Sequence, residues 1–337
     1  MKSLIINTCN QLSERGVITA LLPEAIPIFM LHRVSNEQDT FGGTPVKFLE
    51  QCLAYLRHHR YKVLTLDECH NLLISGEKIP RKVAVFTIDD GFIDHYTNAG
   101  SVFSHFKMPL NFFLISDFID RKLWPWDDQI HVAINDTARQ EIRLTLPDKT
   151  EFLNLKSKSS TNEITRNLRD LLKSQDQTNL YSWISEYLFP ELGLSLGNNI
   201  HHNYQPMSWD NAQELHNAGH GVYAHTCTHR ILSQLPSAIA AQEIQDSIAK
   251  VNEQLGCRQQ YFVYPTGRLC DYNDNNKMTL SENGIKMAFN TEPTYATKKM
   301  GIYDVPRFSL PNTMPNFIQY LAKFEQAKEQ IRKVLFT

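Results

Sequence analysis

Two carboxylates directly after a long apolar run are the first residues in this sequence that could do chemistry. Residues Val83–Ile88 read VAVFTI, which predicts a strand buried on both faces, and Asp89, Asp90 and Gly91 follow it. Barrel enzymes place catalytic groups at the carboxyl ends of buried parallel strands. Successive side chains on a strand point apart, so one carboxylate can bind a metal while the other stays free as a base. The alternative is an ordinary acidic turn.

Two histidines four residues apart, His225 and His229, follow a second apolar strand of sequence GVYA. At this spacing two imidazoles can face one metal from a single turn. With Asp90 they would form a facial triad that leaves positions open for water and a substrate oxygen. The chain has 13 histidines, and His216 and His220 form a second pair with the same spacing. A glycine separates that pair at a predicted helix end, so we expect His216 at the surface and His220 in a structural role.

A third element is the segment Tyr261–Gly267, which reads YFVYPTG. It predicts a strand that ends in a Pro-Thr-Gly turn. Such a turn can present a backbone N–H to a developing oxyanion. Taken alone, it is also consistent with a plain turn.

The elements that must position these residues alternate between strand-like apolar runs and helical stretches, the pattern of an α/β fold with parallel strands. The middle of the chain is polar and breaks this rhythm, and a solvated helical hairpin and a substrate cap are both consistent with it. We therefore predict an N-terminal helical segment (1–25), a barrel domain (26–124 and 206–315), a helical insertion (125–205) and a C-terminal helix (316–337).

The composition limits which partners, cysteine states and locations we expect. The 337 residues are 42% hydrophobic and 21% charged with a net charge of −2, so a nucleic-acid partner is not expected. The six cysteines form no C-x-x-C pair, which favours reduced thiols. Polar residues interrupt the N-terminal apolar stretch, so we expect no secretion signal, no transmembrane segment and a cytoplasmic location. A short amphipathic first helix could still touch a membrane surface or a partner.

In this order, the three elements resemble the polysaccharide deacetylase family, also called the NodB-homology domain or carbohydrate esterase family 4. The family motif T-F-D-D-G is similar to Thr87–Gly91, H-[ST]-x-x-H to His225–His229, and the third motif to Phe262–Gly267. The opening IPIFMLHRVS is similar to that of bacterial members. The resemblance covers about 26–120 and 206–310, and within the family it is nearest to the poly-N-acetylglucosamine deacetylases.

The resemblance implies a distorted (β/α)₇-type barrel of the NodB-homology type with a helical insertion. It implies that Asp89 is the general base and that Asp90, His225 and His229 bind one divalent metal ion. The ligand set suits Zn²⁺, with Fe²⁺, Co²⁺, Ni²⁺ and Mn²⁺ as alternatives. It also implies that the Thr266 backbone N–H stabilises the oxyanion.

The sequence departs from the family pattern at two points. Val263 stands where the third motif usually carries an arginine that orients the catalytic aspartate, and no histidine follows late in the chain to act as the acid. We expect Arg307 to replace the missing arginine beside Asp89. His32, just after the first strand, is the candidate acid, with a core or capping histidine as the alternative.

Sugar sites commonly use aromatic faces against the apolar side of the ring. The candidates here are Tyr264 with the neighbouring Pro265, and Trp209, Trp124 and Trp126. The segment LWPWDDQ, which holds two of the tryptophans, follows a predicted strand and could line the cleft. Simple core positions are the alternative for each ring.

The sequence thus predicts a metal-dependent hydrolase that removes an N-acetyl group from a carbohydrate, an N-acetylhexosamine in a polysaccharide or its precursor. An O-acetyl esterase on a sugar is one alternative, because the chemistry of metal and water is the same. A catalytically impaired carbohydrate-binding module on the same scaffold is another. A zinc nucleobase deaminase is disfavoured, since its H-x-E and P-C-x-x-C elements are missing. The oligomeric state is not indicated.

Overall fold

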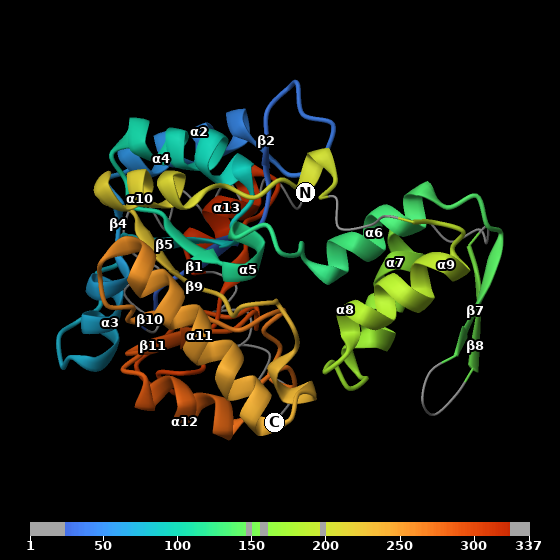
Figure 1. Cartoon of the computed structure of the whole chain (residues 1–337). Coiled ribbons are helices and arrows are strands. Elements are labelled where there is room, and N and C mark those ends of the chain that lie inside the picture. Colours follow the sequence, from blue (N-terminus) through green and yellow to red (C-terminus); the bar gives the residue numbers. More distant parts are fainter. Residues whose placement is uncertain (1–23, 146–149, 156–160, 196–199, 324–337) are drawn as a thin grey trace, which may run out of the picture.

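One curved sheet of eight parallel strands organises residues 24–145, 150–155, 161–195 and 200–323, which the computed structural model describes (Figure 1). All of its strand pairings are parallel, which confirms the predicted α/β class. The order across the sheet is β11 (Met287–Phe289), β10 (Tyr261–Val263), β9 (Gly221–Ala224), β6 (Asn111–Leu114), β5 (Val83–Asp90), β1 (Ile28–Leu31) and β12 (Phe308–Ser309), and β4 (Lys62–Val63) pairs with the start of β5.

The segment that leads into β12 joins the two edges of this sheet. Val305 forms a parallel bridge with Phe289 of β11. A little further along the chain, Phe308 pairs with Phe29 of β1. One short segment therefore contacts both edges and curls the sheet into a barrel-like layer. This arrangement confirms the predicted distorted (β/α)₇-type fold.

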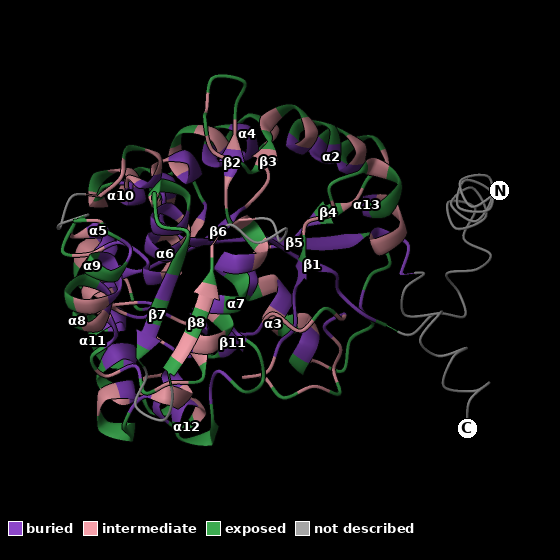
Figure 2. Cartoon of the chain, turned by 90° about the vertical axis from the view of Figure 1, so that its right-hand side faces the viewer, coloured by how far each residue is buried: buried purple, intermediate pink, exposed green. Residues whose placement is uncertain are grey.

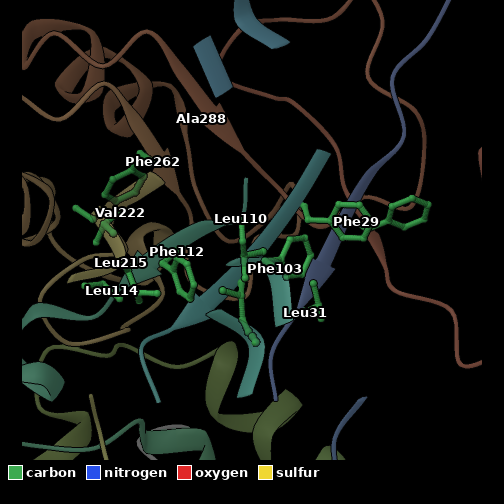
Figure 3. Packing of buried hydrophobic residues seen from close by; sticks show 14 of the residues in the cluster. Phe29, Leu31, Phe103, Leu110, Phe112, Leu114, Leu215, Val222, Phe262 and Ala288 are labelled. Carbon is green, nitrogen blue, oxygen red and sulfur yellow. The ribbon is translucent and has the colours of Figure 1, made fainter. Parts of the chain in front are cut away.

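The strands are apolar because helices cover the sheet. All eight residues of β5 are buried, as expected for a parallel strand packed on both faces, and Figure 2 shows β1 and β5 in the buried interior. Phe29, Phe112 and Phe262 come from three of the strands, and Phe103 and Leu215 pack onto them from helices (Figure 3). The packed interior fixes where the carboxyl ends of the strands lie.

Seven α-helices of six or more residues surround the barrel within the described residues. Three of them begin with capping boxes, at Thr65, Ser208 and Asn273, which satisfy the free N–H groups of the first turn. The seven are α2 (Val46–His58), α3 (Leu66–Ile74), α4 (Ser101–Phe106), α10 (Trp209–Asn217), α11 (Ser237–Leu255), α12 (Asp274–Glu282) and α13 (Met314–Leu321).

Shorter elements connect these units. A two-stranded parallel ladder joins β2 and β3, and a π-helical turn, η1, leads into α4. The short elements around the barrel are β2 (Val34–Ser35), β3 (Thr44–Pro45), η1 (His95–Gly100), α5 (Ser116–Ile119), η3 (His202–Tyr204) and η4 (Leu232–Gln234).

The region predicted as an insertion forms a lobe beside the barrel (Figure 1). It has an apolar core of its own, in which Ile130, Leu168 and Ile184 are buried together. Its elements are α6 (Trp126–Asp136), β7 (Glu141–Thr145), β8 (Thr150–Asn154), α7 (Thr161–Lys173), α8 (Leu180–Trp183), η2 (Ile184–Leu188) and α9 (Phe189–Glu191).

The antiparallel hairpin of β7 and β8 is a departure from the helical insertion that the sequence predicted. Residues 141–145 alternate between exposed and buried side chains, with Ile142 and Leu144 facing the lobe core. This period of two favours a strand over a helix. The lobe is therefore mixed rather than purely helical.

The chain ends are described only in part. Apart from Glu24 and Ala25, the predicted N-terminal helical segment lies outside the described residues, and so does its predicted contact with a membrane or partner. At the other end, α13 covers the start of the predicted C-terminal helix and residues 324–337 lie outside. None of the helices among the described residues has the length and apolar character needed to cross a membrane. The cytoplasmic location stays a prediction.

Candidate active site

Asp89 and Asp90 form the carboxyl end of β5, next to Phe113 and Leu114 of β6. Both are buried, with exposed fractions of 3% and 7%. The backbone turns sharply here, because Asp90 has φ of +89° and Gly91 has φ of +98°. The positive φ of Gly91 favours glycine, and a Cβ atom there would also lie 2.7 Å from the terminal carbon of the Ile119 side chain. The turn sends the two carboxylates in different directions.

Asp89 is paired with Arg307, the contact expected from the sequence. The guanidinium donates from Nη1 to Oδ1 at 2.8 Å and from Nη2 to Oδ2 at 2.7 Å, and Arg307 is completely buried. It also donates to Thr87 Oγ1 at 2.9 Å and to the Asn290 carbonyl at 3.1 Å. Burial by itself raises the pKa of Asp89, but the adjacent guanidinium lowers that pKa to about 2. Asp89 is therefore held as a carboxylate in one orientation.

Asp90 faces the two histidines. Its Oδ1 lies 3.6 Å from His225 Nε2 and 3.5 Å from His229 Nε2. One donor atom from each residue lies within 4.8 Å of the other two. Asp90 Oδ1 is buried without a hydrogen-bond partner among the described residues. An uncompensated carboxylate oxygen between two imidazole nitrogens fits a divalent metal ion.

The protonation of His225 suits metal binding. Burial raises the pKa of Asp90 and lowers the pKa of His225 to about 3. His225 Nδ1 lies 2.7 Å from the Val263 carbonyl oxygen, so it carries the proton and leaves Nε2 free as a donor to a metal. A neutral imidazole with a free nitrogen is the form in which histidine binds metal.

A buried glutamate holds the loop that carries the histidines. Glu243 on α11 accepts hydrogen bonds from the backbone N–H groups of Cys227 and Thr228, at 3.0 and 2.9 Å, and from Arg230 at 2.7 Å. Glu243 was not predicted from the sequence, because it is one polar residue among several on a long helix. Only the packing of α11 against the loop reveals its role.

The loop backbone is also strained. Thr226 and His229 have φ of +64° and +59°, and Thr266 in the neighbouring turn has φ of +54°. For a β-branched residue a positive φ is a true outlier, and such strain gathers at functional sites. The Thr226 hydroxyl accepts from the His229 N–H at 3.0 Å, which helps to hold this conformation.

Thr266 follows β10 and His32 follows β1, and their roles stay proposals. The Thr266 carbonyl accepts from the Thr291 hydroxyl at 2.7 Å, and the Thr266 hydroxyl donates to Asp271. His32 follows β1 and is exposed, and its charge acts on Asp89. An exposed imidazole is accessible to a substrate, unlike a core histidine.

The structure corrects two of the proposed substrate contacts. Tyr264 is fully buried, its ring stacks on Tyr272 with centroids 3.7 Å apart, and its hydroxyl donates to the Tyr303 carbonyl at 3.0 Å. Pro265 beside it is buried as well. Neither residue offers a face to a sugar, because both pack into the barrel interior.

Two of the tryptophans are buried in the same way. Trp124 is 2% exposed and Trp126 is completely buried, with its indole N–H donating to the His229 carbonyl at 3.0 Å. These rings serve the core and the loop rather than a sugar. Trp209 is only partly buried and donates to Asp120 at 2.8 Å, so its proposed contact with substrate stays a prediction.

The second histidine pair lies apart from this cluster. His220 is buried, accepts from the Leu110 backbone N–H through Nδ1 at 3.2 Å and contacts the Ser104 hydroxyl through Nε2 at 2.8 Å. This confirms its predicted structural role. His216 is partly exposed and is not part of the Asp90 cluster.

Two aspartates of the insertion were missed as functional candidates. Asp127 lies 3.6 Å from His229 Nδ1 and is paired with Arg169 of α7 at 2.7 Å. Asp128 beside it has a pKa raised well above its usual value, by burial and by the charge of Asp127. The segment WPWDDQ holds a second pair of adjacent aspartates, which could have indicated a functional role. Only its tryptophans were interpreted, as substrate contacts.

Comparison with known proteins finds similarity to one family over part of the chain. A family model described as polysaccharide deacetylase matches residues 170–288. A Bacillus subtilis (strain 168) protein named "Putative polysaccharide deacetylase YxkH" is 30% identical over 100 residues, which are 30% of this chain and 35% of that relative. The matched part therefore spans about a third of the length of that relative.

Solved structures share the fold over nearly the whole chain. The deacetylase PplD of Streptococcus pyogenes, in complex with acetate, has a TM-score of 0.59 at 16% identity and covers 89% of this chain and 99% of its own. IcaB from Ammonifex degensii has a TM-score of 0.57 at 17% identity and covers 90% of this chain and 98% of its own. At such identities the likeness is one of fold alone.

Proposed function

We propose that this chain, which is similar to the polysaccharide deacetylase family over residues 170–288, hydrolyses the N-acetyl group of a carbohydrate, an N-acetylhexosamine in a polysaccharide or its precursor. One observation carries the proposal. Two adjacent carboxylates have opposite environments, with Asp89 fixed and ionised by Arg307 and Asp90 directed at His225 and His229. Two titratable neighbours with separated pKa values are what paired catalytic roles require.

Asp90, His225 and His229 are the residues that would hold a divalent metal ion, and Zn²⁺ suits this donor set best among the ions named above. Such an ion would polarise the acetyl carbonyl and lower the pKa of water. The three side chains are buried, so the site can exclude bulk water.

The other residues have separate tasks in the proposal. Asp89 takes a proton from the attacking water, and the two hydrogen bonds from Arg307 keep it ionised and oriented. The backbone N–H of Thr266 stabilises the oxygen on which negative charge develops. The exposed His32 donates a proton to the departing amine, which an amide substrate needs more than an ester does.

The test is acetate release from an N-acetylglucosamine oligomer and from an acetyl ester, after reconstitution with divalent metal. Wild type, Asp89→Asn and a matched surface variant, Asp274→Asn, are compared, because the Asp274 side chain is 97% exposed. We expect acetate from wild type and Asp274→Asn, and a loss of about 10²–10⁴-fold in Asp89→Asn, the usual contribution of a general base.

The outcomes separate the alternatives. Preference for the oligomer supports N-deacetylation, and preference for the ester favours an O-acetyl esterase on the same site. Metal binding and carbohydrate binding without release of acetate from any acetylated substrate would contradict the proposal and favour a binding module. Equal activity of Asp89→Asn and wild type would exclude Asp89 as the base.

A further inference from the structure

The insertion holds the histidine loop with its own side chains. Trp126 of α6 donates its indole N–H to the His229 carbonyl at 3.0 Å. Tyr181 of α8 donates its hydroxyl to the Thr228 carbonyl at 2.7 Å. Two neighbouring carbonyls of the loop are therefore fixed from the insertion, on residues next to and within the proposed ligand set.

The imidazole of His229 has one nitrogen for a metal and one for a partner. Nε2 points toward Asp90 at 3.5 Å, and when Nε2 binds a metal ion the proton of the neutral ring lies on Nδ1. Nδ1 is buried and lacks a hydrogen-bond partner within the described part of the chain, and the same holds for Asp127 Oδ1. These two atoms face each other at 3.6 Å. A possible donor, His229 Nδ1, and a possible acceptor, Asp127 Oδ1, thus lie only slightly beyond hydrogen-bond length from each other.

Asp127 is itself fixed. Arg169 of α7 donates to its Oδ2 at 2.7 Å, which leaves Oδ1 for His229. The Asp127 side chain is 13% exposed, and it lies in the first turn of α6, where free backbone N–H groups favour a carboxylate. The pair comes from two different helices of the insertion, so it holds its position only while both helices are docked.

The two proposed metal-binding histidines would then be supported differently. His225 Nδ1 donates to the Val263 carbonyl at 2.7 Å, within the barrel sheet. For His229 the barrel supplies no such carbonyl among the described residues, and the insertion supplies a carboxylate. A carboxylate behind a metal-binding imidazole fixes the ring and makes it a stronger donor.

We propose that Asp127, held by Arg169, is a positioning residue that accepts the Nδ1–H of His229, so that the insertion completes the metal site. The inference rests on the proposed function, since it assumes that His229 binds a metal. The insertion is then neither a solvated hairpin nor only a substrate cap. Because binding energies are reciprocal, metal binding and the docking of α6 and α7 on the loop favour each other.

The test measures metal affinity without turnover. Dissociation constants for Zn²⁺ and Co²⁺ are determined for the full chain by competition with a chromophoric chelator. The variants are Asp127→Asn and a matched control, Asp136→Asn, which makes the same change at an exposed residue of α6. We expect Asp127→Asn to weaken metal binding about 10–100-fold, as loss of an outer carboxylate partner does, and Asp136→Asn to bind like wild type.

Two further measurements separate positioning from folding. Melting temperatures of the metal-free proteins report whether a variant is folded, and the Co²⁺ absorption spectrum reports ligand geometry. Arg169→Gln keeps Asp127 but removes the guanidinium that holds its carboxylate, so this variant should also bind metal more weakly than wild type. In the double variant with Asp127→Asn, Arg169→Gln should weaken metal binding little further. Metal should also slow amide hydrogen exchange in α6 and α7 of wild type, and less so in Asp127→Asn.

The inference can fail separately from the proposed function. If wild type binds metal and both Asp127→Asn and Arg169→Gln bind it with wild-type affinity and spectrum, the positioning role is wrong and the proposed function stands. If reconstituted wild type binds no Zn²⁺ or Co²⁺, both are overturned.

Discussion

Replacement of Arg307 by methionine should damage both stability and activity, because it leaves a carboxylate buried without its cation. Arg307 is completely buried and Asp89 is 3% exposed, so solvent cannot replace the lost contacts. The change removes both hydrogen bonds to Asp89 and those to Thr87 and Asn290. Methionine fills much of the space of the arginine stem without adding a charge.

The magnitude follows from this burial. Removal of one partner of a buried ion pair costs about 3–5 kcal/mol. Unfolding entropy is about 2.1 cal/mol/K per residue, or about 0.7 kcal/mol per kelvin for 337 residues, so the melting temperature should fall by about 4–7 °C. Activity should fall further than stability explains, because burial without Arg307 raises the pKa of Asp89 and removes the base.

The assay is calorimetry together with acetate release at a temperature where the variant is folded. Arg268→Met is the matched control, since the Arg268 side chain is 55% exposed and its change should cost less than about 0.5 kcal/mol. The double variant Asp89→Asn/Arg307→Met should be more stable than the sum of the single changes predicts. A melting temperature within 1 °C of wild type and full activity in Arg307→Met would refute the reasoning.

Three other changes test separate parts of the account. His32→Ala should lower acetate release from an amide by about 10²–10⁴-fold and from an ester much less, and equal losses would exclude His32 as the acid. Glu243→Gln should lower the free energy of unfolding by about 1–3 kcal/mol in urea, whereas the exposed Glu253→Gln on the same helix should not. Burial lowers the pKa of His220 below the usual 6.5. The neutral His220 therefore contributes fully to the free energy of unfolding above pH 6.5, and this contribution is lost as the pH falls below 6.5. Urea midpoints at pH 7.5 and 5.5 should therefore differ more for wild type than for His220→Asn, and parallel shifts would contradict this.

Much of the site could be predicted from the sequence because its residues directly follow strands that are evident in the sequence. The run before Asp89 is apolar and β-branched, so the strand and its carboxyl end were evident. His225 follows β9 in the same way, and parallel strands bring both ends to one edge of the sheet. The contact of Arg307 with Asp89 was expected from the family resemblance, which implies an arginine beside this aspartate.

The remainder depended on packing that local sequence does not encode. Asp127 reaches His229 only because α6 docks on the loop. Tyr264 and Trp126 were predicted to face a sugar, but their polar tips reach backbone carbonyls inside the fold, which makes burial favourable. A buried aromatic ring and an exposed one look the same in sequence when both follow a strand.

The most direct test of the central claim is the metal content of the purified chain after reconstitution and dialysis, for wild type and Asp90→Asn with Asp274→Asn as the control. The account predicts one divalent ion per chain in wild type and Asp274→Asn, and its loss in Asp90→Asn, because Asp90 supplies the oxygen between the two imidazoles. Absence of metal from wild type, or full retention by Asp90→Asn, would contradict the account.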